Sequence, residues 1–137
     1  MAVVEQLLRS EEDGTLSFGN HALAHKAKLE DYEHGGDVYK VKTFSTMTKL
    51  EKNGMFLYES VPGTSVNRFS ETDSGVSFAV EGAADAQLTL GLGDDTEYEV
   101  FVAGNSVGTM KTGLGGKLSI SVELCGMGEV EVKVVEA

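Results

Sequence analysis

The chain has 137 residues, of which 41% are hydrophobic and 7% aromatic, a length that suits one compact domain with a real core. Its net charge is −11, from 22 acidic and 11 basic residues. That charge repels phosphate backbones and anionic lipids, so we expect neither nucleic acid nor a membrane as partner. No apolar run approaches the length that spans a bilayer, and the N-terminus lacks the basic region and cleavage site of a secretory signal. We therefore expect a cytoplasmic protein.

The start of the chain carries signals of both helix and strand. Residues 3–11 space their apolar side chains as a helix does, whereas the turn pair Asp13-Gly14 before residues 15–18 indicates a hairpin. We favour a strand for 3–11. For residues 21–28 a single helical turn remains open.

Three histidines lie in this part of the chain. His21 and His25 are four residues apart and would share one face of a helix, as zinc ligands often do, but no third ligand lies nearby. His34 precedes a Gly-Gly pair and is typical of a solvated turn residue. We interpret all three as structural or surface residues and expect no metal site from them.

Hairpins with recognisable turns follow. Asn53-Gly54 separates residues 46–51 from 55–60, and Gly35-Gly36 separates 26–33 from 38–44. Asn-Gly pairs are favoured in two-residue hairpins because both positions accept a positive φ. Four aromatic residues cluster in these hairpins and are the ligand-binding candidates, as rings that could stack on sugar faces: Tyr32, Tyr39, Phe56 and Tyr58.

The Pro62-Gly63 pair is the best candidate boundary in the chain. It predicts an N-terminal β-hairpin region over residues 1–62 and an immunoglobulin-like sandwich module over 63–137, packed together as one unit. In the second part, residues 76–80, 118–124 and 130–134 alternate apolar and polar side chains, as strands with one buried face do.

The run Leu92 to Val102 gives the most specific sign of architecture. A turn at Gly93-Asp94-Asp95 opens an alternating strand that contains Tyr98. This resembles the tyrosine corner of immunoglobulin-like and fibronectin type III sandwiches, in which a tyrosine at the start of a strand bonds upstream backbone. We therefore expect Tyr98 in the core, with its hydroxyl turned back onto the chain.

Carboxylates gather in the same run. Asp94 and Asp95 are weak candidates for calcium, which takes oxygen ligands. They are also ordinary turn formers, and the Asp-x-Asp-x-Asp spacing of a calcium loop is absent, so we expect no metal and no cofactor. Cys125 is the single cysteine, and its apolar neighbours indicate a small buried side chain.

No motif for catalysis is present. The sequence has no Gly-x-Ser-x-Gly elbow, and residues 113–117 lack the spacing of a phosphate-binding loop. We assign no catalytic residue.

Residues 40–44 and 48–64, together with 96–102, 108–112 and 115–118, resemble a family of short proteins from gut Firmicutes of the clostridial group. The resemblance covers nearly the whole chain, and members are labelled endosialidase or endosialidase chaperone. The label implies a sialidase-type hydrolase or a helical trimer-forming appendage. Sialidases clamp the substrate carboxylate with three arginines, whereas this chain has only Arg9 and Arg68.

The sequence thus predicts an all-β protein: an immunoglobulin-like β-sandwich with an additional N-terminal β-hairpin region. We expect a non-enzymatic binding or assembly protein. Its candidate partners are a second copy of the chain in a homo-oligomer, an unknown protein, or a glycan. A glycan-binding accessory module is the first alternative, and a sialidase-type hydrolase the second.

Overall fold

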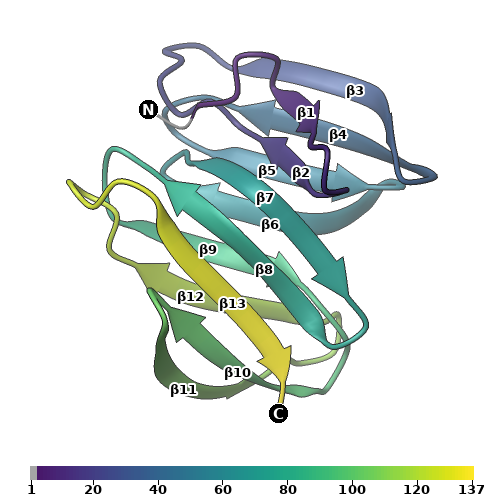
Figure 1. Cartoon of the computed structure of the whole chain (residues 1–137), viewed down its shortest axis with the longest axis vertical. Helices are drawn as coiled ribbons and strands as arrows, with labels where there is room; N and C mark the ends of the chain where they lie inside the picture. The colour runs from purple at the N-terminus through teal and green to yellow at the C-terminus, as the bar shows by residue number, and fades with distance from the viewer. Residues whose placement is uncertain (1–2) are drawn as a thin grey trace.

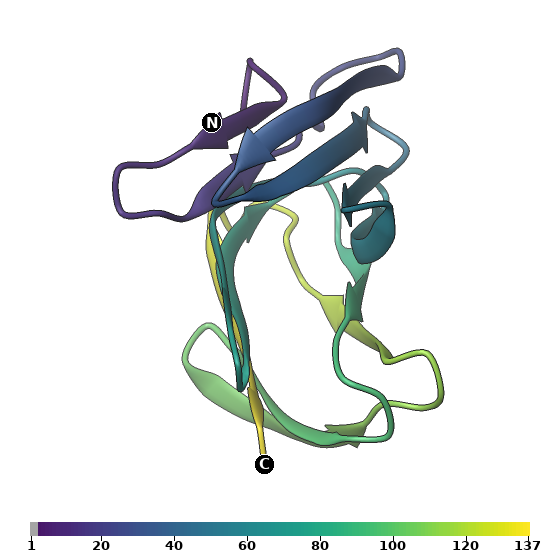
Figure 2. The same ribbon diagram turned by 90° about the vertical axis from the view of Figure 1, so that its right-hand side faces the viewer.

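A computed structural model describes residues 3–137 as two antiparallel β-sheets packed face to face (Figures 1 and 2). Every regular element in this range is a strand, which confirms the predicted all-β sandwich. The alternation of apolar and polar residues explains it, because each strand buries one face between the sheets and exposes the other.

Sheet A has seven strands in the order β1-β2-β7-β8-β13-β10-β11. Their bounds are β1 Leu8–Ser10, β2 Leu16–Phe18, β7 Ser65–Thr72, β8 Gly75–Glu81, β10 Glu97–Val102, β11 Asn105–Lys111 and β13 Val130–Glu136. Sheet B has six strands in the order β12-β9-β6-β5-β4-β3. Their bounds are β3 Ala27–His34, β4 Asp37–Thr43, β5 Thr48–Lys52, β6 Met55–Val61, β9 Ala86–Gly91 and β12 Lys117–Val122.

In both sheets, a strand that precedes Pro62 in the chain pairs with a strand that follows it. In sheet A, β2 pairs with β7, and in sheet B, β6 pairs with β9. The purple β1–β2 hairpin at the start of the chain therefore lies beside the teal β7 (Figure 1). The two parts predicted on either side of Pro62 share both sheets and a continuous core.

The hairpins predicted from turn pairs are present. Asn53-Gly54 joins β5 to β6, and Gly35-Gly36 joins β3 to β4. Asn53 takes a φ of 52° and Gly54 one of 78°, as such a turn requires. The hairpin around Asp13-Gly14 is also present, with its first strand confined to Leu8–Ser10. Residues 21–26 form turns and bends instead of a helix.

Four aromatic rings occupy the centre of the core, from β2, β6, β7 and β8. The ring of Phe18 meets that of Tyr58 edge-on, with centroids 5.2 Å apart, and Phe69 stacks on Phe78 at 5.5 Å. Tyr58 also contacts Phe78 edge-on at 5.7 Å. The cluster joins the two sheets, because Tyr58 belongs to sheet B and the other three rings to sheet A.

A chain of buried hydrogen bonds lies next to this cluster. The N–H of Asn20 donates to Thr43 Oγ1, which lies 2.8 Å from Thr48 Oγ1. Thr48 Oγ1 in turn donates to the carbonyl of Thr64 at 2.7 Å and accepts from the Thr64 N–H at 3.1 Å. Because Thr48 has one hydroxyl hydrogen and gives it to Thr64, Thr43 must be the donor between the two threonines.

The predicted position of Tyr98 in the core, with its hydroxyl turned back onto the chain, is confirmed. Tyr98 is 6% exposed, and its hydroxyl accepts the N–H of Gly93 at 2.9 Å. The bond ties the loop after β9 to the start of β10. Tyr98 is therefore a framework residue and is not available to a ligand.

Candidate functional site

The four aromatic residues predicted to bind a ligand do not form an exposed platform. Tyr58 is fully buried and Tyr39 is 7% exposed, so the prediction is wrong for both. Their strand positions point between the sheets, where Tyr58 joins the aromatic cluster and its hydroxyl bonds Thr64 Oγ1 at 2.7 Å. Burial raises the pKa of the Tyr58 phenol well above its ordinary range.

The other two rings are half-exposed but are held apart. The hydroxyl of Tyr32 accepts the backbone N–H of Ser10 at 2.9 Å and lies 2.9 Å from Ser10 Oγ, so it fastens β3 to β1. Phe56 on β6 lies beneath the ammonium of Lys117, which is 4.7 Å from the ring centroid. Tyr32 packs against the core, so the rings of Tyr32 and Phe56 do not form one continuous binding surface.

The calcium candidates Asp94 and Asp95 are turn residues between β9 and β10. Lys111 Nζ lies 3.3 Å from Asp95 Oδ1 and forms an exposed ion pair with that carboxylate. Within residues 3–137 no three His, Cys, Asp or Glu side chains lie close enough together to hold a metal ion.

The structure exposes Cys125 and buries His21. Cys125 is exposed, so the prediction of a buried thiol is wrong: it lies in the loop after β12, where only its neighbour Leu124 is buried. His21 is buried, with Nδ1 2.7 Å from Ser65 Oγ, and desolvation lowers its pKa. His21 is thus a structural residue, whereas His25 is exposed.

The outer face of sheet A carries the best candidate site, a hollow of about 410 Å³ that we call the sheet A trough. This volume lies within the usual range of ligand sites. Small outward side chains make its floor: Ser70 on β7, and Ser77 and Ala79 on β8. Larger side chains stand at its edges: Asp13, Arg68, Glu131 and Lys133.

Strand register sets the floor of the trough. Ser77 pairs with Ser70 on one side and with Lys133 on the other, and Lys133 pairs with Phe101 on β10. These four residues form one row across four strands. Phe101 and Lys133 also line a second hollow of about 260 Å³, so the trough continues past β13 to the turn after β10.

Arg68 stands at the edge of the trough because of a β-bulge. The pairing of β7 with β8 shifts register between Asn67 and Ser70, and Arg68 has a φ of 56°. A positive φ is uncommon for a residue other than glycine, and bulges re-aim side chains. The Arg68 guanidinium is directed to solvent, 3.8 Å from a carboxylate oxygen of Glu129.

A polar network holds this bulge. The N–H of Arg68 donates to the buried hydroxyl of Ser17 at 3.1 Å, and that hydroxyl donates to Glu11. Arg9 donates to Glu11 at 3.0 Å and to the side-chain oxygen of Asn67 at 3.2 Å. The hydrogen bond from Ser17, followed by that from Arg9, lowers the pKa of Glu11, so the acceptor is ionised.

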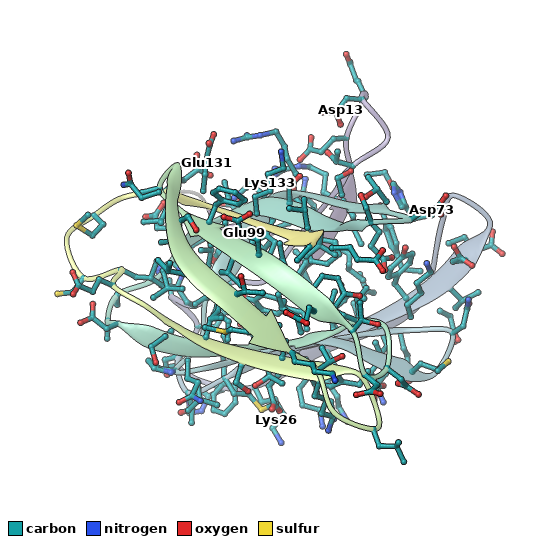
Figure 3. The ribbon with its side chains drawn as sticks, turned by 90° about the horizontal axis from the view of Figure 1, so that it is seen from below. Asp13, Lys26, Asp73, Glu99, Glu131 and Lys133 are labelled. Atoms are coloured by element: carbon teal, nitrogen blue, oxygen red, sulfur yellow. The ribbon has the colours of Figure 1, made fainter. Side chains whose placement is uncertain are left out.

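The hairpin turn between β1 and β2 forms one wall of the trough. Asp13 Oδ1 accepts the Thr15 hydroxyl at 2.6 Å and the Thr15 N–H at 3.0 Å, and these bonds lower the pKa of Asp13. Figure 3 shows Asp13 projecting beyond the sheet on the same side of the molecule as Glu131 and Lys133. The trough therefore presents fixed charges of both signs.

Sequence reasoning missed every residue of the trough as a site residue. The sequence contained one signal for Phe101. Alternation along β10 places Tyr98 and Val100 on the inner face of the strand, and therefore Phe101 on the outer face with Glu97 and Glu99. No local pattern identifies the Arg68 bulge.

Comparison with protein-family models, with curated proteins and with solved structures finds no match for the chain. In the part of the chain that the structure describes, no helix has the length and apolar character to cross a bilayer.

Proposed function

We propose that this protein is a non-enzymatic binding module that holds an oligosaccharide in the sheet A trough. The observation that carries the proposal is the row from Ser77 through Lys133 to Phe101, which places polar groups beside one half-exposed ring. Carboxylates and cations at the edges suit the many hydroxyl groups of a sugar, which both donate and accept hydrogen bonds. The ring suits the apolar face of one sugar unit.

The same trough supports the binding role over the hydrolase alternative. Hydrolysis of a glycosidic bond ordinarily needs one carboxyl with a raised pKa to donate a proton, opposite a second carboxylate. Asp13 has a lowered pKa. Arg9, which a sialidase would need to clamp a carboxylate, is engaged with Glu11 and Asn67.

A glycan array of neutral and acidic oligosaccharides tests the proposal, followed by isothermal titration calorimetry with the best-bound oligosaccharide. Phe101→Ala should weaken binding at least about tenfold, equivalent to about 1.4 kcal/mol. Phe56→Ala is the matched control, because it removes a half-exposed ring of sheet B and should leave the affinity unchanged. Absence of any bound oligosaccharide, or equal effects of the two variants, would contradict the proposal.

A second variant separates the Arg68 charge from its unusual backbone. Arg68→Asn removes the guanidinium, while asparagine tolerates a positive φ, so the bulge and the fold should persist. We expect weaker binding with an unchanged thermal midpoint. Mass spectrometry should recover the oligosaccharide intact after incubation, and shorter products would instead support the hydrolase.

We also propose that the C-terminal part is an immunoglobulin-like module, supported by the Tyr98 corner. Homo-oligomerisation stays a prediction, which light scattering can check.

A further inference from the structure

The outer face of sheet B carries a second charged feature, away from the trough. Five of the chain's eleven Lys and Arg residues gather at one end of this sheet, on or next to β3, β4 and β5. We call them the lysine face: Lys26, Lys28, Lys40, Lys42 and Lys49. Figure 3 shows Lys26 on the side of the molecule opposite Asp13, Glu131 and Lys133.

Strand register sets three of these lysines side by side. Lys28 pairs with Lys42, and Lys42 pairs with Lys49. Neighbouring strands lie about 4.8 Å apart, so three like charges stand in a straight row across the sheet. Their inward neighbours Val41 and Leu50 are fully buried, which fixes the outward direction of the row.

This arrangement works against the stability of the free protein. Like charges directly opposite each other destabilise a sheet. Repulsion from Lys26, together with desolvation and the charges of Lys28, Lys40 and Lys49, lowers the pKa of Lys42. Two of the five lysines have counter-charges at the outer limit of ion pairing, because Lys40 Nζ lies 3.9 Å from Glu30 Oε2 and Lys49 Nζ lies 3.9 Å from Glu51 Oε2.

We propose that the lysine face docks an acidic polypeptide surface of a partner protein. Local charge complementarity carries the proposal, since the row concentrates positive charge on a chain of net charge −11. A polyanion with charges evenly spaced along a sugar backbone fits less well than a flexible acidic polypeptide, because Glu51 pairs with Lys40 and Glu59 with Lys49, so carboxylates flank the row. A short acidic cluster within a mixed protein surface avoids those carboxylates.

Nucleic acid fits less well for a separate reason. The outward positions of β3, β4 and β5 hold no aromatic ring on which a base could stack. The face also contains lysine without arginine, and lysine is a hydrated point charge that lacks the bidentate fork used to read phosphate and base edges. Lysine does suit a long-range attraction to a carboxylate-rich surface.

The test measures binding of poly-L-glutamate at low and at physiological salt, with single-stranded oligothymidine and heparin as separate arms. Lys42→Gln with Lys49→Gln should lower the affinity for poly-L-glutamate at least about tenfold at low salt. The matched control is Lys111→Gln with Lys117→Gln. It removes the same charge from β11 and from β12, which is the edge of sheet B farthest from β3, and it should change binding less than about twofold. Oligothymidine or heparin binding more tightly than poly-L-glutamate would overturn the proposal.

A stability measurement distinguishes docking from a merely protective role at the sheet edge. Lys42→Gln alone should raise the urea midpoint of the free protein at low salt, because it breaks the row, and added salt should remove the gain. A higher midpoint together with lost poly-L-glutamate binding supports the proposal. The proposal is overturned if the Lys42→Gln variant has the higher midpoint but the wild-type protein binds no poly-L-glutamate, since the lysines would then serve only to protect the sheet edge from association. Failure of the trough variants to alter glycan binding leaves this result unaffected, because the two faces are tested with different probes.

Discussion

The buried threonine chain gives the sharpest prediction about stability. Thr48→Val keeps the shape of the side chain but removes the oxygen that serves both backbone groups of Thr64 and the hydroxyl of Thr43. All three threonines are fully buried, so water cannot replace the lost partner. The variant should therefore lose more stability than an ordinary surface substitution.

The expected loss can be worked from the number of groups left without a partner. Each unsatisfied buried group costs about 1–3 kcal/mol, and Thr48→Val strands the Thr64 N–H, the Thr64 carbonyl and the Thr43 hydroxyl. The lower bound is thus about 3 kcal/mol. That is a large part of the roughly 5–15 kcal/mol by which domains are stable.

Urea unfolding followed by far-UV circular dichroism measures the loss, since the chain has no tryptophan. With an m-value near about 1.5 kcal/mol/M, the midpoint should fall by about 2 M. Thr89→Val is the control, because its hydroxyl meets Ser119 Oγ at 3.1 Å on the solvent side of sheet B, and it should cost less than about 0.5 kcal/mol. A loss below about 1 kcal/mol for Thr48→Val would refute the reasoning.

Three further predictions concern the corner, a turn and a loop. Tyr98→Phe removes the acceptor of the Gly93 N–H and should cost about 1 kcal/mol in urea unfolding, with an unchanged dichroism spectrum; no change would show that the corner bond adds nothing. Gly116→Ala places a Cβ against the backbone oxygen of Leu92 at a φ of +72° and should cost more than about 2 kcal/mol. Gly104→Ala, at a φ of +82° with open space around it, should cost about 1 kcal/mol. Asp85 accepts two backbone N–H groups, which lower its pKa from 3.8, so its contribution is present above that pH and is lost as the pH falls through the folded-state value. The midpoint difference between wild type and Asp85→Asn should shrink on acidification, and a constant difference would contradict this account.

Local rules predicted the framework well. The Asn53-Gly54 hairpin follows from the backbone that a tight turn requires, and the position of Tyr98 follows from alternation plus a preceding turn. Both depend on residues close together in the chain, which is why the sequence alone contains them.

The candidate site depends on residues far apart in the chain and could not be predicted in the same way. Lys133 meets Ser77 and Phe101 only because β13 inserts between β8 and β10. Tyr39 and Tyr58 were misassigned because alternation separates two faces of a strand without telling which one faces a core built by distant strands. The positive φ of Arg68 arises from a bulge that tertiary pairing imposes.

The central position of β13 in sheet A governs when the protein can acquire its shape. Residues 130–136 come last among the strands, yet they separate β8 from β10 and hold both by antiparallel pairing. Until they have been synthesised, the β10–β11 hairpin has no neighbour in its sheet, and the row beneath the trough does not exist. Folding of sheet A is consequently a late, non-local event of the kind that slows β-rich chains. A nascent chain that stops short of Val130 would expose two unpaired strand edges, which are the usual starting points of aggregation.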